Sequence, residues 1–174
     1  MSKTVILLRH ARAEDAIMGT QDFDRRLTED GRAMTQRVAA HLQALGTTID
    51  RIIASSAART RETAEIMSAG VSSPATLIVR DSLYNATADT FASAIGQECE
   101  EDEASVLVVG HNPGIGGLMC HWTEESLSVP PATLAIFEVA ADMDWTAIRL
   151  HMKPFPQLVG MIQDGAIVRH RKAT

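Results

Sequence analysis

The fold is decided by the stretch Thr4-Val5-Ile6-Leu7-Leu8-Arg9-His10-Ala11, an apolar run that ends in a cation and an imidazole. A nearly continuous apolar run is typical of a central strand that is covered on both faces of its sheet. Catalytic groups of α/β proteins often lie where such strands end, at their carboxyl edges. We therefore expect Arg9 and His10 to emerge from a buried strand into a functional loop.

A second apolar run ends in a similar way, in the stretch Ser105-Val106-Leu107-Val108-Val109-Gly110-His111-Asn112-Pro113. It places His111 at the end of another predicted central strand. Two histidines at two strand ends, with arginines nearby, favour a site that handles a phosphoryl group.

The composition is that of one ordinary globular domain. The chain has 174 residues, of which 45% are hydrophobic and 22% are charged, so we expect a single domain over residues 1–174. The formal net charge of -6 gives no general electrostatic help to nucleic-acid binding, although a local basic pocket is compatible with it. We expect no nucleic-acid partner.

Cysteine usage and hydropathy indicate the compartment. The two cysteines, Cys99 and Cys120, do not form a CxxC pair, which is typical of a protein from a reducing compartment. The amino terminus lacks the pattern of a signal peptide, and no apolar run approaches the roughly 20 residues that span a bilayer. We therefore expect a cytoplasmic protein without a membrane partner.

Apolar periodicity predicts strands that alternate with helices. The predicted strands cover residues 5–8, 51–54, 76–79, 106–109, 134–139 and 147–151, of which the last two form a candidate hairpin. The predicted helices cover residues 28–45, 57–69, 88–96 and 113–122, with Thr28 and Asn112 as candidate caps. This alternation favours an α/β fold, a three-layer α/β/α sandwich with a mostly parallel central sheet. The methionines, Met18 included, are expected in the core.

The chemistry expected of Arg9 and His10 depends on the imidazole. A neutral imidazole can attack phosphorus through one ring nitrogen while the other donates to a backbone carbonyl, which fixes the tautomer. The planar guanidinium of Arg9 matches phosphate oxygens. Taken alone, His10 could equally be a satisfied strand-end histidine, and Arg9 could form a surface salt bridge.

The second candidate constellation is the segment Ser55-Ser56-Ala57-Ala58-Arg59-Thr60-Arg61-Glu62-Thr63. It follows a predicted strand, and the amino terminus of a helix in that place favours anions. Arg59 or Arg61 could reach a bound phosphate from the first turn. The alternative is a helix whose exposed arginines pair with Glu62 and Glu65.

The third constellation is Gly110-His111-Asn112-Pro113-Gly114. A lone histidine of this kind is more often structural, but beside Arg9 and His10 it becomes a candidate donor to phosphoryl oxygens. The run Gly114-Ile115-Gly116-Gly117 lacks the spacing of a dinucleotide site, and no lysine completes a phosphate-binding loop. The histidines and cysteines show no metal-ligand spacing, so we expect no metal.

Together these motifs resemble the histidine phosphatase superfamily, which has the phosphoglycerate-mutase-like fold. The resemblance rests on Arg9-His10, on Ser56-x-x-Arg59-x-x-x-Thr63 and on Gly110-His111-Asn112, in this order. The stretch Asp24-Arg25-Arg26-Leu27-Thr28-x-x-Gly31 is similar to the family's segment before its first helix. The small size, and Ala11 where larger relatives usually carry glycine, look most like the SixA-type phosphohistidine phosphatases.

The resemblance implies a mechanism and a set of catalytic residues. His10 would attack phosphorus and become phosphohistidine. The phosphoryl oxygens would be held by Arg9, Arg59 and His111. Water would then hydrolyse the intermediate, with no metal and no cofactor. Arg59 rather than Arg61 matches the family's second arginine, because of its place within the motif.

One departure from the family concerns the general acid. Many relatives carry a glutamate after the third strand, but the stretch Asp81-Ser82-Leu83-Tyr84-Asn85-Ala86 has none. Four aspartates are candidate acids, each of which could equally be a solvated loop residue: Asp15, Asp22, Asp24 and Asp81. An alkoxide leaving group needs a proton, whereas an imidazole leaves a phosphohistidine with modest help. The sequence therefore favours a phosphoramidate substrate.

Three functions follow from these motifs, and the sequence favours the first. It is a phosphatase that removes phosphate from phosphohistidine on a protein, such as a histidine phosphotransfer domain. The first alternative is a small-molecule phosphomonoesterase of the same superfamily, with a loop aspartate as its acid. The second is a catalytically silent phosphoprotein-binding module, which would not need a nucleophilic imidazole.

Overall fold

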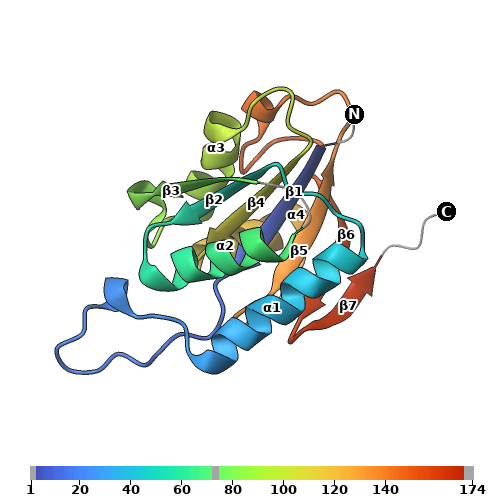
Figure 1. Ribbon diagram of the computed structural model, residues 1–174. Helices are drawn as coiled ribbons and strands as arrows, with labels where there is room; N and C mark the ends of the chain where they lie inside the picture. The colour runs from blue at the N-terminus through green and yellow to red at the C-terminus, as the bar shows by residue number, and fades with distance from the viewer. Residues whose placement is uncertain (1–2, 72–74, 171–174) are drawn as a thin grey trace.

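A seven-stranded sheet forms the middle layer of the protein, as the computed structural model of residues 3–71 and 75–170 shows (Figure 1). In chain order the strands are β1 (Lys3–Arg9), β2 (Arg51–Ser55), β3 (Thr76–Arg80), β4 (Ser105–Gly110), β5 (Leu134–Val139), β6 (Gln157–Gln163) and β7 (Ala166–His170). Across the sheet they follow the order β3-β2-β4-β1-β5-β6-β7. The first four pair in parallel, and the remaining pairs are antiparallel. The sheet is therefore mixed, with three parallel and three antiparallel pairs, and β6 runs in the same direction as β1–β4.

Helices cover both faces of this sheet. One face carries α1 (Glu29–Ala44) and α2 (Ala58–Gly70), and the other carries α3 (Ala88–Glu98) and α4 (Gly114–Thr123) (Figure 1). Three short 3-10 turns lie in the connections: η1 (Asp22–Asp24), η2 (Asp81–Leu83) and η3 (Trp145–Ala147). The three-layer α/β/α sandwich predicted from the sequence is confirmed.

Strand β1 lies in the middle of the sheet, and both of its faces are buried. Val5 and Leu7 belong to the core beneath α3 and α4. Ile6 and Leu8 belong to the core beneath α1 and α2. A strand between two cores is apolar at successive positions, which is why its sequence reads as a continuous run rather than an alternating one.

The register of the parallel strands brings their ends together. β1 and β4 are neighbours, with Arg9 opposite Gly110. β2 flanks β4 on its other side, with Ala54 opposite Val109. The last residues of three strands therefore meet at one end of the sheet, the carboxyl edge, and the residues that follow them are neighbours in space.

The segment between β1 and α1 projects from the body as an arm, residues 12–28 (Figure 1). Its two limbs meet at the base, where Ala13 and Leu27 form an isolated β-bridge and Leu27 is fully buried. Ile17 and Met18 lie in the arm, with 66% and 104% of their surface exposed. The expected core position of Met18 is therefore wrong, because the arm leaves the sheet and carries this side chain into solvent.

Of the two predicted caps, Thr28 is the N-cap of α1, whereas the N-cap of α4 is Pro113 and Asn112 lies one residue before it. Thr28 Oγ1 accepts from Gly31 N at 3.0 Å, and Asn112 Oδ1 accepts from Gly116 N at 3.2 Å. A Cβ atom on Gly31 would come within 2.0 Å of Arg12 O. The start of α1 and the base of the arm are thus in direct backbone contact, which only glycine permits.

The predicted strand over residues 147–151 is wrong. This stretch begins in η3 and continues as a turn, because Trp145 and Ile148 are fully buried anchors that pack with α3. The strand that pairs with β5 is β6, and β6 in turn pairs with β7. Between β6 and β7, Asp164 and Gly165 have φ values of 51° and 70°, which is the geometry of a tight hairpin turn.

Within the described ranges, no helix is both long and apolar enough to cross a bilayer. The same part of the chain holds no group of three or more histidine, cysteine or acidic side chains that could bind a metal ion. Cys99 and Cys120 are both free cysteines.

Candidate active site

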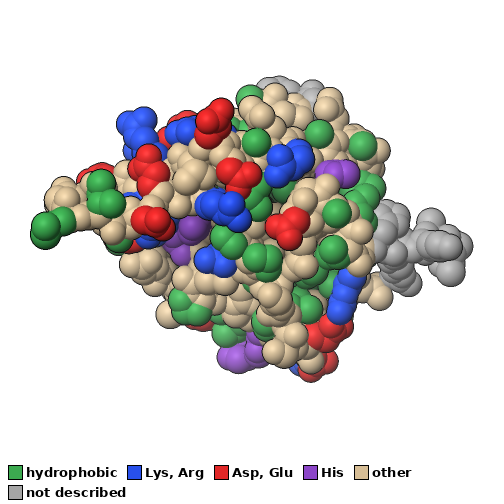
Figure 2. Space-filling view, turned by 90° about the horizontal axis from the view of Figure 1, so that it is seen from below, with side chains coloured by type: hydrophobic (Ala, Val, Ile, Leu, Met, Phe, Trp, Pro, Cys, Tyr) green, Lys and Arg blue, Asp and Glu red, His purple; other side chains and the backbone are tan. Residues whose placement is uncertain are grey.

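The residues predicted from the three motifs meet at the carboxyl edge. His10 and His111 pack edge to face, with their ring centroids 5.3 Å apart. Arg59 Nε donates to His10 Nε2 at 3.3 Å. All three side chains are buried, and Arg9 precedes His10 at the end of β1. Figure 2 looks onto this edge and shows histidine, basic and acidic side chains gathered beside the projecting arm.

The protonation state of His10 follows from its contacts. Its Nδ1 lies 2.8 Å from Ala11 O, and since a carbonyl only accepts, Nδ1 carries the hydrogen. The pKa of His10 is lowered to about 3, mainly by burial. The Ala11 bond opposes this shift, while the charges of Arg59 and Arg9 add to it. The ring is therefore neutral near pH 7, with a lone pair on Nε2.

Helix α2 and strand β4 hold the backbone around His10. Ala11 N donates to Thr63 Oγ1 at 3.3 Å, and Thr63 Oγ1 donates to Arg59 O at 2.7 Å. His10 N donates to Gly110 O at 3.0 Å. The threonine of the second motif thus positions the residue whose carbonyl sets the His10 tautomer.

His111 is oriented by Ser55, the last residue of β2. His111 Nε2 lies 2.7 Å from Ser55 Oγ, and its Nδ1 is buried with no partner in the described ranges. The pKa of His111 is lowered to about 4, first by burial and then by the charge of Arg59. In the neutral ring the Ser55 hydroxyl can donate to Nε2, which leaves Nδ1–H as a free donor.

Arg9 is anchored by the loop that precedes β5. Arg9 Nη1 donates to Val129 O at 2.8 Å, and Asn112 Nδ2 donates to the same carbonyl at 3.0 Å. Burial lowers the pKa of Arg9, but a guanidinium stays charged near pH 7. The first and third motifs therefore share one anchor, which fixes the guanidinium beside the two imidazoles.

Four buried polar atoms at this edge have no hydrogen-bond partner within the described part of the chain: Arg9 Nε, Ser56 Oγ, His111 Nδ1 and Thr133 Oγ1. Ser56 follows β2 directly, and Thr133 O accepts from Arg9 N at 3.0 Å. Buried polar groups are nearly always paired in folded proteins. Unpartnered donors at one edge of the sheet are the kind of group that a binding site for an oxyanion uses.

Arg59 also reaches across to the arm, where Asp22 takes up its two terminal nitrogens. Arg59 Nη1 donates to Asp22 O at 2.6 Å, and Nη2 donates to Asp22 Oδ2 at 3.0 Å. Tyr84 OH and Arg25 Nη1 also donate to this carboxylate, at 2.7 Å and 2.8 Å. These bonds, the Tyr84 bond foremost, hold the pKa of Asp22 well below its usual range. Asp22 is thus an ionised carboxylate beside the imidazoles.

Of the four aspartates predicted as candidate acids, the structure brings Asp22 to the cluster. The side chains of Asp15, Asp24 and Asp81 are exposed. Within the described residues, none of them has a hydrogen bond to the four motif residues, which are Arg9, His10, Arg59 and His111. An ionised carboxylate accepts a proton more readily than it donates one. The geometry therefore supplies a carboxylate at the site but not a carboxylic acid.

The sequence did not single out Tyr84, Val129 or the positioning role of Thr63. Tyr84 follows η2 at the end of β3, so its strand-end place was a usable signal. Its ring lies edge to face with His111, at a centroid distance of 5.7 Å. Val129 acts through its backbone carbonyl, which leaves no trace in a side-chain pattern.

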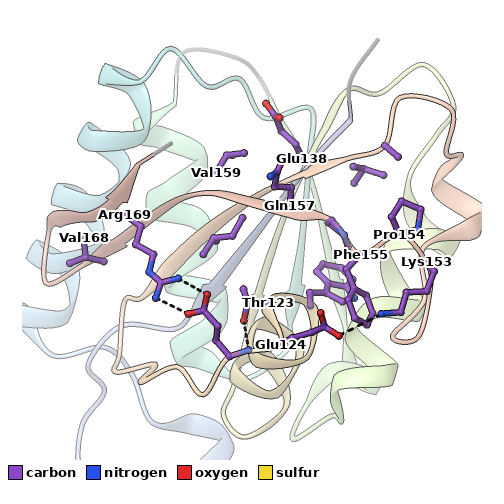
Figure 3. Close-up of a pocket in the computed structure, with 16 residues that line it drawn as sticks. Thr123, Glu124, Glu138, Lys153, Pro154, Phe155, Gln157, Val159, Val168 and Arg169 are labelled. Atoms are coloured by element: carbon purple, nitrogen blue, oxygen red, sulfur yellow. Dashed lines mark hydrogen bonds and ion pairs between the residues drawn. The ribbon is translucent and has the colours of Figure 1, made fainter. Parts of the chain in front are cut away.

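A groove of about 1170 Å³ lies elsewhere, between the end of α4 and the β5–β7 part of the sheet (Figure 3). None of the four motif residues lines it. Two ion pairs lie in it: Arg169 Nη2 lies 2.7 Å from Glu125 Oε2, and Lys153 Nζ lies 3.7 Å from Glu124 Oε1. The groove is therefore separate from the imidazole cluster.

Comparison with known proteins agrees with this geometry. A family model described as Histidine phosphatase superfamily (branch 1) matches residues 5–85. The solved structure of the candidate phosphohistidine phosphatase SixA of Agrobacterium tumefaciens is 30% identical, with a TM-score of 0.72. That match covers 82% of this chain and 97% of the other. The chain belongs to the histidine phosphatase superfamily.

Two further relatives of this histidine phosphatase extend the comparison. A candidate SixA structure from Nakamurella multipartitia is 26% identical, with a TM-score of 0.76, and the match covers 94% of this chain and 96% of the other. An uncharacterised chloroplast protein of Arabidopsis thaliana is 33% identical over 122 residues, 66% of this chain and 56% of the relative. The chain thus spans just over half the length of that relative. Within its superfamily the chain is SixA-like, and these likenesses support phosphatase activity, that of a hydrolase.

We expect this histidine phosphatase to lose stability as the pH falls from 7 to 5.5. In the folded state the pKa values of His10 and His111 are lowered to about 3 and about 4, so both rings stay neutral. In the unfolded chain both rings take up protons near pH 6.5, which favours unfolding. The free energy of unfolding, measured by urea denaturation, should fall by about 2 kcal/mol over this range.

The control for this pH dependence is the double variant His10→Gln/His111→Gln. Its unfolding free energy should change much less between pH 7 and 5.5, because glutamine does not titrate. A slope equal to that of the unaltered protein would show that the two rings titrate normally in the folded state.

Proposed function

We propose that this phosphatase removes the phosphoryl group from phosphohistidine on a protein, through a phosphohistidine intermediate on His10. The proposal is supported most by the neutral His10 ring, whose Nε2 lies 3.3 Å from Arg59 Nε. Unpartnered donors lie at the same edge. A nucleophile and oxyanion donors in one buried place are what phosphoryl transfer requires.

The first step transfers the phosphoryl group to the enzyme. The lone pair of His10 Nε2 attacks phosphorus in line and forms a P–N bond, while the P–N bond of the substrate breaks. The leaving imidazole keeps the bonding pair and takes a proton from solvent. The three equatorial oxygens receive hydrogen bonds from Arg9, Arg59 and His111. The Ala11 carbonyl stabilises the positive charge that the His10 ring acquires.

The second step regenerates the enzyme. Water attacks the phosphorus of phosphorylated His10, the P–N bond breaks, and the bonding pair returns to Nε2. Inorganic phosphate leaves, and the protons of the water remain with phosphate and solvent. The first step exchanges one P–N bond for another, so the intermediate lies close in energy to the substrate. This cycle uses no metal and no organic cofactor.

The state of Asp22 favours a phosphohistidine over a phosphate ester. A phosphate ester releases an alkoxide, which needs a proton from an acid. Asp22 is the candidate acid that reaches the cluster, and its bonds to Tyr84, Arg25 and Arg59 keep it ionised. An imidazole is a better leaving group and is protonated readily by solvent. The small-molecule phosphomonoesterase is therefore the weaker alternative.

The arm favours a protein as the carrier of the phosphohistidine. Its η1 turn contacts Arg59 through Asp22, and the same arm carries the exposed side chains of Ile17 and Met18. Two adjacent exposed apolar residues on an arm that also reaches the catalytic cluster suit contact with a protein surface. A catalytically silent binding module would not need the fixed tautomer of His10. We keep the cytoplasm as the predicted location, with which the free Cys99 is compatible.

The proposed function is tested by comparing a histidine-phosphorylated protein with an alkyl phosphate. We expect kcat/KM on the phosphohistidine to be at least ~100-fold higher, because the site offers no protonated acid to an alkoxide. Rapid acid-free quenching with ³²P-labelled substrate should trap base-stable, acid-labile label on the enzyme. Comparable rates on the two substrates would overturn the substrate assignment, and label retained in His10→Gln would overturn the intermediate.

Arg59 and Arg61 form a matched pair of neighbouring arginines on α2. Arg59→Ala should lower kcat by ~10³-fold or more, because a buried donor to the phosphoryl oxygens is lost. Arg61→Ala should keep nearly full activity, because that side chain is exposed. Steady-state kinetics on a phosphohistidine substrate decide between them, and the reverse pattern would refute the assignment.

The protein part of the substrate is tested at the tip of the arm. Ile17→Ser/Met18→Ser should lower kcat/KM for a histidine-phosphorylated protein by ~10-fold, because apolar contact with the carrier is lost. Hydrolysis of free phosphohistidine should not change, because these side chains point into solvent. An equal effect on both substrates, or none on the protein, would argue against docking through the arm.

A further inference from the structure

Asp22 occupies, with its backbone oxygen and one carboxylate oxygen, donors of Arg59 that a phosphoryl group would use. Asp22 takes both terminal nitrogens of Arg59, one through its backbone oxygen at 2.6 Å and one through Oδ2 at 3.0 Å. Arg59 Nε donates to His10 Nε2. A carboxylate and a phosphoryl group present similar pairs of anionic oxygens to a guanidinium, so they compete for the same fork.

We propose that Asp22 is an internal competitor for the phosphoryl site, which substrate must displace from Arg59 before the phosphoryl oxygens can bind there. This inference rests on the proposed role of Arg59 as a phosphoryl ligand. In the exchange, Arg59 releases Asp22 and donates its terminal N–H groups to phosphoryl oxygens. Asp22 keeps its bonds to Tyr84 and Arg25, so its charge stays satisfied.

The arm is built so that this exchange is local. Its base is held independently of Asp22, by the bridge between Ala13 and Leu27 and by a bond of 3.0 Å from Leu27 N to Glu62 Oε2. The η1 turn also rests on Tyr84 through Phe23, with ring centroids 5.2 Å apart. Release of Arg59 therefore does not require the base of the arm to open.

The competition makes Asp22 a specificity-determining residue. A small anion that binds through the Arg59 guanidinium alone makes no other contact to offset the free-energy cost of displacing the Asp22 carboxylate. Free phosphate can contact Arg9 and His111 as the phosphoryl group does, but only a phosphorylated substrate also contacts the surface around the site, and this further contact favours the exchange. Asp22 thus selects against free phosphate, the product, and against unrelated anions.

The test measures binding of inorganic phosphate by isothermal titration calorimetry. Asp22→Asn removes the charge of the competitor and should tighten phosphate binding by ~10-fold. Asp22→Ala, which also removes the side-chain oxygens, should tighten it at least as much. The matched control is Glu29→Gln, which removes one charge from the exposed first turn of α1 and should leave the affinity unchanged.

Two outcomes would count against the competition. Weaker or unchanged phosphate binding in both Asp22 variants would show that Asp22 supports the Arg59 geometry instead. Equal tightening in Glu29→Gln would show a general charge effect. Failure of the proposed function looks different: adding Arg59→Ala to Asp22→Asn would then leave phosphate affinity unchanged, because phosphate would not bind at Arg59 at all.

Discussion

The hydrogen bond from His10 Nδ1 to the Ala11 carbonyl is the interaction on which the site depends. A neutral imidazole carries one hydrogen, and the carbonyl draws it to Nδ1, which leaves the lone pair on the nitrogen beside Arg59. Under the proposed mechanism, the opposite tautomer would present an N–H to phosphorus and could not attack it. The surrounding backbone, including the Ala11 bond to Thr63, is arranged so that this carbonyl is in place before substrate arrives.

Burial adds the second constraint, because it keeps both imidazoles neutral. The free-energy cost of placing a charge on His10 or His111 is what lowers their pKa values to about 3 and about 4. The same burial strengthens the field of the two guanidiniums, since water screens it less. A chain with a net charge of -6 can therefore still hold a local positive charge at the carboxyl edge, where Asp22 offsets only one of the two guanidiniums. The net charge limits which partners the protein surface as a whole attracts, but it says little about the charge at one buried site.

What the sequence could predict depends on whether the signal is local. The apolar runs of β1 and β4 are local, and parallel pairing of neighbouring strands then obliges His10 and His111 to meet. The pattern at residues 147–151 predicted a strand that does not form, because burial of Ile148 against α3 holds this segment in a turn. The hairpin of β6 and β7 had a local signal in the turn residues Asp164-Gly165. The pairing of β6 with β5 had none, because a long connection separates the two strands in the sequence.

The bond between Asp22 and Arg59 had no such signal. It joins residues 37 positions apart through an arm whose path no periodic pattern determines. The sequence could therefore name Asp22 as one of four carboxylates but could not choose among them. The sequence position of Asp22 also could not reveal its protonation state, because its pKa depends on hydrogen-bond donors from three different segments, Arg25, Arg59 and Tyr84.

These donors connect the missing acid to the choice of substrate. Each bond that brings Asp22 to the site also stabilises its ionised form, so the residue that is near enough to protonate a leaving group is the least able to do so. A carboxylic acid at this position would require fewer donors and more apolar surroundings. This arrangement supports the proposed substrate, because the imidazole of a phosphohistidine can leave without an enzymic acid.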